Sequence, residues 1–176
     1  MRLIRLLLAA AIVAAAAFAI YRGPVLRYRC NLDKRRAATM VDTALKAPSE
    51  YGRIELGRRA IEIANRWLEL FPADYELYIT RGGGEEAAGM KERALQSYQQ
   101  AYALNQRPEV LLYMALVQFD QGRPDEAMVN LTKAATFNLS VGRYVDSATK
   151  QRIADAARER EARLTAAARA KRAPGT

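Results

Sequence analysis

The stretch Gly84–Lys91 is the closest approach to a ligand-binding motif, because its two glycines have the Gly-x4-Gly spacing of a phosphate loop. In such a loop the backbone N–H groups surround the phosphates, a lysine directly follows the second glycine, and a Ser or Thr binds magnesium. Here Met90 separates Gly89 from Lys91, and no hydroxyl residue follows the lysine. The surrounding pattern is also helical throughout, whereas a phosphate loop joins a strand to a helix. The stretch therefore predicts no nucleotide site.

Nucleophilic, acid–base and metal chemistry lack their usual residues. The 176 residues include no histidine and a single cysteine, Cys30, which excludes imidazole bases, Cys-His pairs, internal disulfides and ordinary zinc sites. Two pairs of carboxylates, Glu85-Glu86 and Asp125-Glu126, are expected at helix starts or on solvated faces. We therefore expect no catalytic residue, no metal site and no cofactor, and we predict that the chain is not an enzyme.

The formal net charge of +9 raises nucleic acid as a partner, but the distribution of that charge argues against it. Residues 1–36 carry a net charge of +7, residues 37–140 carry −3, and residues 141–176 carry +5. The basic excess thus lies at both ends, and few aromatic residues accompany the C-terminal arginines. Anionic lipid headgroups, which attract basic residues beside a membrane, fit this distribution better.

An unbroken apolar run extends from Leu6 to Ile20, behind a basic N-terminus that contains Arg2 and Arg5. These fifteen residues span about 22 Å as a helix, which is short of the roughly 30 Å hydrocarbon core of a bilayer. Residues 3–21 cross the bilayer if the flanking arginines extend to its two surfaces. We expect residues 1–22 to form a single-pass anchor in the inner (cytoplasmic) membrane of a bacterium.

A cleaved secretory signal is the alternative to an anchor. Ala17-Phe18-Ala19 has the small-x-small pattern of a cleavage site, and cleavage would release a secreted or periplasmic protein. The anchor is favoured because the basic juxtamembrane linker, residues 23–36, is unlike the start of a translocated chain. The side of the membrane stays open. The basic downstream flank favours a cytoplasmic domain, whereas the short basic N-terminus before the apolar run favours the opposite orientation.

Small residues lie on one stripe of the expected membrane helix. Such a stripe lets a second membrane helix approach closely, although an alanine-rich segment also gives this spacing by chance. The residues predicted to pack in this way are Ala10, Ala14, Ala15 and Ala19.

The middle of the chain contains an internal repeat. Residues 93–105 and 126–138 align at an offset of 33, with small and large residues alternating in the same order. In the first copy Ala94 and Ala101 are small, and in the second Ala127 and Ala134 are small. A glycine stands five residues before the first alanine of each copy, which predicts a turn before each of these helices.

The helical pattern, the alternation of small and large residues and the period near 34 resemble the tetratricopeptide repeat (TPR) family. The resemblance implies an all-α fold in which two to three helix pairs stack as a short right-handed solenoid over residues 37–139. Small residues let the helices of a pair approach closely, and stacking covers the apolar face that one pair leaves exposed.

The first and second repeats depart from the family pattern. Trp67 stands where the family usually has a small residue, in a helix expected over residues 54–71 that follows one over 37–46. Gly82-Gly83-Gly84 lies inside the first helix of the second repeat, and each glycine costs about 0.8–1 kcal/mol there relative to alanine. This helix is expected to be weak or broken, with plain loop distortion at the glycines. The alternative is a hinge or a place where the backbone of a partner approaches closely.

After the repeats, residues 140–176 are expected to form a C-terminal capping helix and a basic tail. The helix-compatible part runs from about residue 146 to 171, has few apolar residues and ends in a frayed terminus.

Proteins that resemble this family bind partners on a concave face lined by the first helix of each pair. Tyr113 and Phe119 are the expected aromatic anchors, because aromatic residues dominate interface energetics. The resemblance implies a membrane-anchored adaptor that binds a partner protein, or alternatively a permanent accessory subunit that stabilises a membrane complex. The residues predicted to line the concave face are Glu76, Ile79, Thr80, Glu109, Leu112, Tyr113, Leu116 and Phe119.

Overall fold

The computed structural model describes residues 2–137 and, beyond them, a few isolated positions of helical backbone. Within this part of the chain every regular element is a helix. The expected C-terminal capping helix and basic tail otherwise lie outside the described residues. The isolated positions are Gln151, Asp155, Arg158, Ala162, Arg163 and Thr165.

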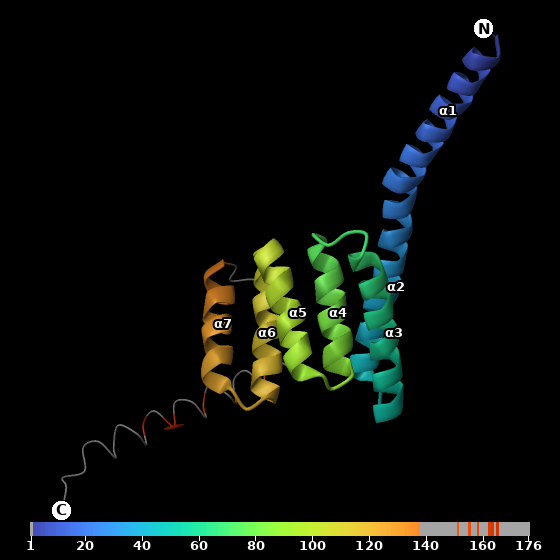
Figure 1. Cartoon of the computed structure of the whole chain (residues 1–176). Helices are drawn as coiled ribbons and strands as arrows, with labels where there is room; N and C mark the ends of the chain where they lie inside the picture. Colours follow the sequence, from blue (N-terminus) through green and yellow to red (C-terminus); the bar gives the residue numbers. More distant parts are fainter. Residues whose placement is uncertain are drawn as a thin grey trace, which may run out of the picture.

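The N-terminal helices α1 (Arg2–Ile20), η1 (Tyr21–Val25) and α2 (Leu26–Lys46) form one uninterrupted rod (Figure 1). The short π-helical segment η1 contains Pro24, which lacks a backbone N–H and collides with the preceding turn of a regular helix. A wider turn accommodates a proline without ending the helix. Residues 23–36, expected as a linker, are therefore helical. Their helix already belongs to the repeats, because Cys30 and Ala37 are buried.

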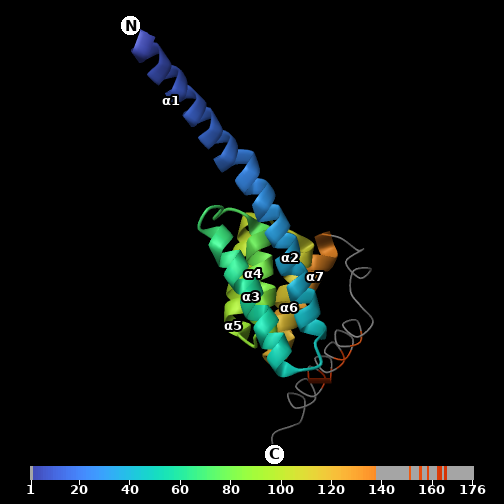
Figure 2. The same ribbon diagram turned by 90° about the vertical axis from the view of Figure 1, so that its right-hand side faces the viewer.

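Among the described residues, one continuous helix is long and apolar enough to cross a membrane, and α1 forms its apolar part. Its side chains project away from the repeats: Ile12, Val13 and Ile20 are 60–68% exposed. In Figure 2 α1 extends away from the helical domain with no other helix beside it. Length and composition also suit a signal sequence, so both alternatives for residues 1–22 persist.

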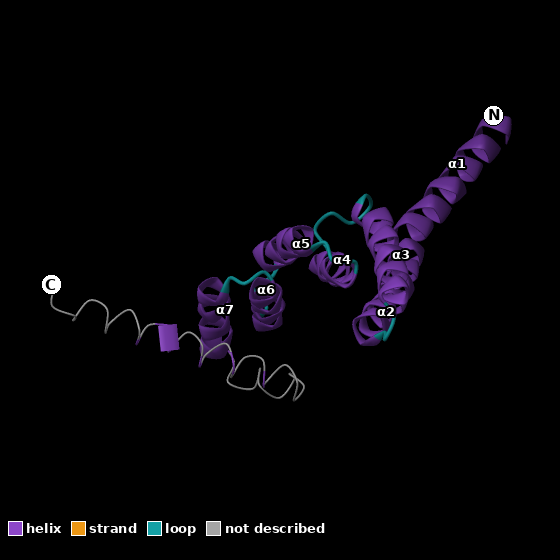
Figure 3. Cartoon of the chain, turned by 90° about the horizontal axis from the view of Figure 1, so that it is seen from below, coloured by secondary structure: helices purple, strands orange, loops and turns teal. Residues whose placement is uncertain are grey.

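Three antiparallel helix pairs follow one another along the domain. Figure 3 shows α2, α4 and α6 on the concave side of an arc, with α3, α5 and α7 behind them. The expected succession of helix pairs and its all-α class are confirmed. The pairs are α2 with α3 (Glu50–Leu68), α4 (Tyr75–Ala87) with α5 (Lys91–Leu104), and α6 (Pro108–Asp120) with α7 (Pro124–Phe137).

Local signals fix where these helices begin and end. The Ser49 hydroxyl accepts a hydrogen bond from the Gly52 N–H at the start of α3, as an N-cap does. Gly89 and Gly122 have φ of +77° and +71°, a conformation that glycine adopts without the strain of a side chain. These are the two turn glycines that the repeat predicts. Each ends the first helix of a pair and reverses the chain.

Helix α4 is continuous through its three glycines, so the expectation of a broken helix is wrong. A Cβ added at Gly84 would lie 2.7 Å from the Gly57 carbonyl oxygen, and one at Gly57 would lie 2.6 Å from the Gly84 carbonyl oxygen. Gly83 packs in the same way against Val41 of α2, and Gly82 against the Tyr98 ring. The glycines weaken the helix locally, but they let three neighbouring elements pack closely against α4.

Candidate partner-binding groove

Two adjoining pockets lie on the concave side of the helix arc. Their volumes are about 480 Å³ and 330 Å³, and both are lined by Ala38 of α2 and by Ile79 and Thr80 of α4. Because they share these residues, the pockets form one continuous depression. We call it the concave groove: its walls are α2 and α6, and its base is α4. The larger pocket is its proximal end, nearer to α1, and the smaller one is its distal end.

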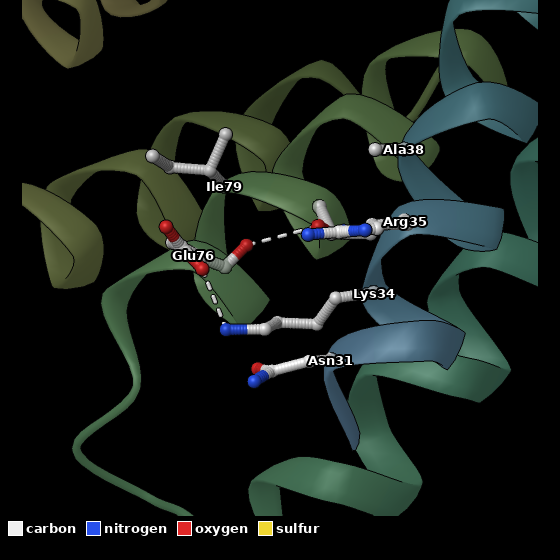
Figure 4. Close-up of a pocket in the computed structure, with 7 residues that line it drawn as sticks. Asn31, Lys34, Arg35, Ala38, Glu76 and Ile79 are labelled. Atoms are coloured by element: carbon white, nitrogen blue, oxygen red, sulfur yellow. Dashed lines mark hydrogen bonds and ion pairs between the residues drawn. The ribbon is translucent and has the colours of Figure 1, made fainter. Parts of the chain in front are cut away.

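The proximal end of the groove is polar and charged (Figure 4). Asn31, Lys34 and Arg35 reach into it from α2 towards Glu76 on α4. The Lys34 ammonium lies 3.0 Å from an Asp74 carboxylate oxygen and 2.5 Å from Glu76. Burial lowers the pKa of Lys34, but its hydrogen bonds to the Glu76 and Asp74 carboxylates outweigh this effect and leave the pKa raised. These ion pairs tie the first helix pair to the second.

The distal end of the groove is mainly apolar. Val41 and Leu45 line it from α2, and Tyr113 and Leu116 line it from the opposite wall, α6. The described residues that line this end include two carboxylates, of Asp42 and Glu86, and no Lys or Arg. An apolar side chain with a neighbouring cation is therefore complementary to this end of the groove.

Tyr98 of α5 reaches through the second helix pair to the base of the groove and is 3% exposed. Its hydroxyl donates a 2.9 Å hydrogen bond to Glu86, and its ring centroid lies 5.5 Å from that of Tyr113. Burial, together with the negative charge and hydrogen bond of Glu86, raises the pKa of Tyr98 well above its usual value of 10; Glu85 and Tyr113 add to this shift. Tyr98 thus fixes the position of a groove carboxylate and of an aromatic wall residue.

Tyr98 makes the stability of the fold depend on pH in the alkaline range. An unfolded tyrosine loses its proton near pH 10, whereas folded Tyr98 keeps it to higher pH because its pKa is raised. This stabilisation is complete below pH 10 and is lost as the pH rises further, by about 1.4 kcal/mol per pH unit. We expect Tyr98→Phe to lose stability less steeply between about pH 10 and 11.5 in urea unfolding followed by circular dichroism.

The matched control for this titration is Tyr51→Phe, since the Tyr51 ring is 81% exposed. The pKa values of Lys34 and Tyr113 are raised as well, so an alkaline loss of stability persists in every variant. If Tyr98→Phe and Tyr51→Phe show the same slope as the unmodified chain, Tyr98 does not retain its proton in the folded state.

A buried carboxylate lies next to the groove but does not line it. Glu85, expected at a helix start or on a solvated face, is 2% exposed between α4 and α5, so this expectation is wrong. It accepts a hydrogen bond from the Ser97 hydroxyl and lies 3.3 Å from the Arg93 guanidinium. These partners compensate the buried charge, which gives Glu85 a structural role. In the described part of the chain no cluster of Asp, Glu, Cys or His residues could hold a metal ion.

Of the eight residues that were predicted to line the concave face, five line the groove and three do not. Tyr113 and Leu116 line its distal end, and Phe119, although half-buried, lines neither end. Leu112 is buried, and Glu109 lies 3.4 Å from Arg107. The other three predicted residues, Glu76, Ile79 and Thr80, also line the groove.

The sequence prediction misses the entire α2 wall of the groove. Its charged residues are typical of a juxtamembrane linker, and they obscure the helical periodicity. One signal was available: Cys30, Ala37 and Ala44 recur every seven residues, and all three are buried on one face of α2. The residues missed on this wall are Asn31, Lys34, Arg35, Ala38, Val41, Asp42 and Leu45.

The stacked helix pairs, with the groove across their first helices, define a TPR-like fold, here preceded by an apolar helix. Among solved structures, the chain is similar to a thermophilic TPR protein of Thermus thermophilus, with a TM-score of 0.60 and 23% sequence identity. The similarity covers 87% of this chain and 75% of the other, and it shows the fold. No sequence profile of a known family and no curated protein sequence matches the chain.

Proposed function

We propose that the chain is a membrane-anchored adaptor that binds a partner protein in its concave groove. The observation that carries this proposal is the groove itself, which crosses all three helix pairs and combines an apolar distal end with a charged proximal end. Tyr113 and Leu116 offer apolar contact area where a partner side chain enters.

One observation favours a second candidate, a permanent subunit of a membrane complex. The helix continues from α1 through η1 to α2, so the repeats follow the apolar helix with no loop between them. A connection without a loop suits a fixed position in an assembly better than recruitment of a mobile partner does. A partner that co-migrates stoichiometrically with the chain after mild detergent extraction supports this second candidate. A chain that migrates alone and binds its partner reversibly supports the adaptor.

Introducing a charge at Leu45 tests the groove. Leu45 is 50% exposed and lines the distal end, so Leu45→Glu leaves the core intact while placing a carboxylate among apolar contacts and beside Asp42. We expect the amount of partner retained by the tagged full chain from native membranes to fall by more than about tenfold. Quantitative mass spectrometry measures the retained protein.

Val129→Glu is the matched control, since Val129 is 51% exposed on α7, away from the groove. We expect it to retain the partner as the unmodified chain does. Equal losses in the two variants, or no loss in either, would show that the groove is not the docking surface.

A further inference from the structure

The charged side chains that line the groove differ in sign between its two ends. At the proximal end Lys34 pairs with Asp74 and Glu76, and Arg27 also pairs with Asp74. Arg35 is exposed and makes no ion pair with any described residue. This end therefore presents one guanidinium, directed into the groove from α2 (Figure 4).

The distal end presents carboxylates. Asp42 pairs with Lys46 one turn further along α2, but the two side chains are 65% and 73% exposed. Such exposed pairs are weak and are readily exchanged for another partner. Glu86 is held in place by Tyr98 and lines the same end. A cation from a partner therefore meets two carboxylates there.

The spacing of these charges suits a helix. Arg35 and Asp42 are seven residues apart on α2, about 10.5 Å along its axis. A second helix packed along α2 brings residues i and i+7 to the same two positions, with i+3 and i+4 on the same face between them. The groove has helices on three sides and is open on the fourth, so an added helix completes a four-helix packing unit.

Resting on the proposed function, we propose that the concave groove binds an amphipathic helix of the partner protein. On one face this helix carries an acidic residue opposite Arg35, apolar residues opposite Ile79 and Leu116, and a basic residue opposite Asp42 and Glu86. The acidic and basic residues are seven positions apart. The ligand class is thus a helix with opposite charges flanking an apolar pair, and a purely acidic or purely basic segment does not match both ends.

Charge-reversal variants of the full chain, purified from native membranes, test the charge pattern. Arg35→Glu and Asp42→Lys are each expected to lower retention of the partner about fivefold, because each turns an attraction into a repulsion. Arg35→Lys keeps the charge and is expected to stay within about twofold. Arg58→Glu on α3 reverses an exposed arginine outside the groove and is expected to have no effect.

Carbodiimide coupling, which joins a carboxylate to an amine, tests the helical form. In the unmodified chain Asp42 or Glu86 is expected to couple to a lysine of the partner. In Arg35→Lys the new amine is expected to couple to an acidic residue of the same segment. Mass spectrometry then gives the separation of the two coupled partner residues. A helix gives seven or eight positions, whereas an extended segment covers 10.5 Å in about three.

The outcomes distinguish this inference from the function on which it rests. If Leu45→Glu has no effect on retention, or if the unmodified chain retains no partner, both the groove function and the helix are overturned. If Leu45→Glu releases the partner while Arg35→Glu and Asp42→Lys do not, the groove function stands and the charge pattern is wrong. A separation of about three residues between the coupled positions overturns the helix in favour of an extended segment.

Discussion

Replacing Trp67 with alanine is expected to lower the free energy of unfolding by about 3–5 kcal/mol, the usual range for a buried tryptophan. Trp67 is 6% exposed and packs with Cys30, Leu68 and Leu77, while its ring stacks on Phe71 at a centroid distance of 6.1 Å. The substitution removes the largest side chain of this cluster and leaves a cavity. Urea unfolding of the full chain in detergent, followed by circular dichroism, measures the loss.

Trp67→Ala is expected to destabilise the region around residues 26–36 more than the rest of the domain. Trp67 also donates a 3.0 Å hydrogen bond to Asp33, so it connects α3 to the first half of α2, where the charged end of the groove begins. In Trp67→Ala, amide hydrogen exchange over residues 26–36 is expected to accelerate, with α5 little changed. Trp67→Phe keeps a ring and removes the N–H donor, and it is expected to cost about 1–2 kcal/mol. Equal stability of the alanine variant and the unmodified chain would contradict the importance of this cluster.

The sequence predicted the features of the fold that depend on local periodicity. The offset of 33 between Ala94 and Ala127 placed α5 and α7, and both alanines are buried where their helices meet a partner helix. The two turn glycines, Gly89 and Gly122, were predicted from the same repeat, because each stands five residues before an alanine that begins a helix pattern. Glycine is the usual residue where the chain must adopt a positive φ at the end of a helix. Such features need only residue spacing and the geometry of one helix.

Features that depend on contacts between distant elements were missed. Gly82-Gly83-Gly84 destabilises an isolated helix, and only the positions of α2, α3 and α5 reveal that these glycines let neighbours pack closely. Glu85 shows the same limitation, since its burial is compensated by Ser97 and Arg93 of α5. For the groove, the sequence identified residues on α4 and α6 but not those of α2. The many charged residues of that helix predict a surface exposed to solvent or lipid headgroups. Its buried face consists of the small residues Cys30, Ala37 and Ala44, which give only a weak hydrophobic signal.

Gly57→Ala is expected to destabilise the chain by about 2 kcal/mol, even though alanine is the better helix former. The added Cβ would lie 2.6 Å from the Gly84 carbonyl oxygen, 3.2 Å from the Ala88 nitrogen and 3.3 Å from the Ala87 Cβ. Two of these atoms belong to the backbone and cannot rotate away, so α3 and α4 must separate. Overpacking of this kind costs about 3 kcal/mol at the upper end of its usual range, and the gain in helix propensity returns about 1 kcal/mol.

Gly23→Ala is the matched control for this substitution, because a Cβ added at Gly23 meets nothing within 4 Å. Both positions are helical, and the two variants differ mainly in the contact with a neighbouring helix. The gain in helix propensity is smaller at Gly23, because Pro24 follows it and a proline disfavours helical backbone at the preceding residue. Urea unfolding of the full chain is expected to show a lower midpoint for Gly57→Ala and an equal or higher one for Gly23→Ala. A Gly57→Ala chain as stable as the unmodified one would mean that α3 and α4 separate without cost. The close approach of the two backbones would then be a consequence of the packing around it, and the glycines of α4 would not be needed for it.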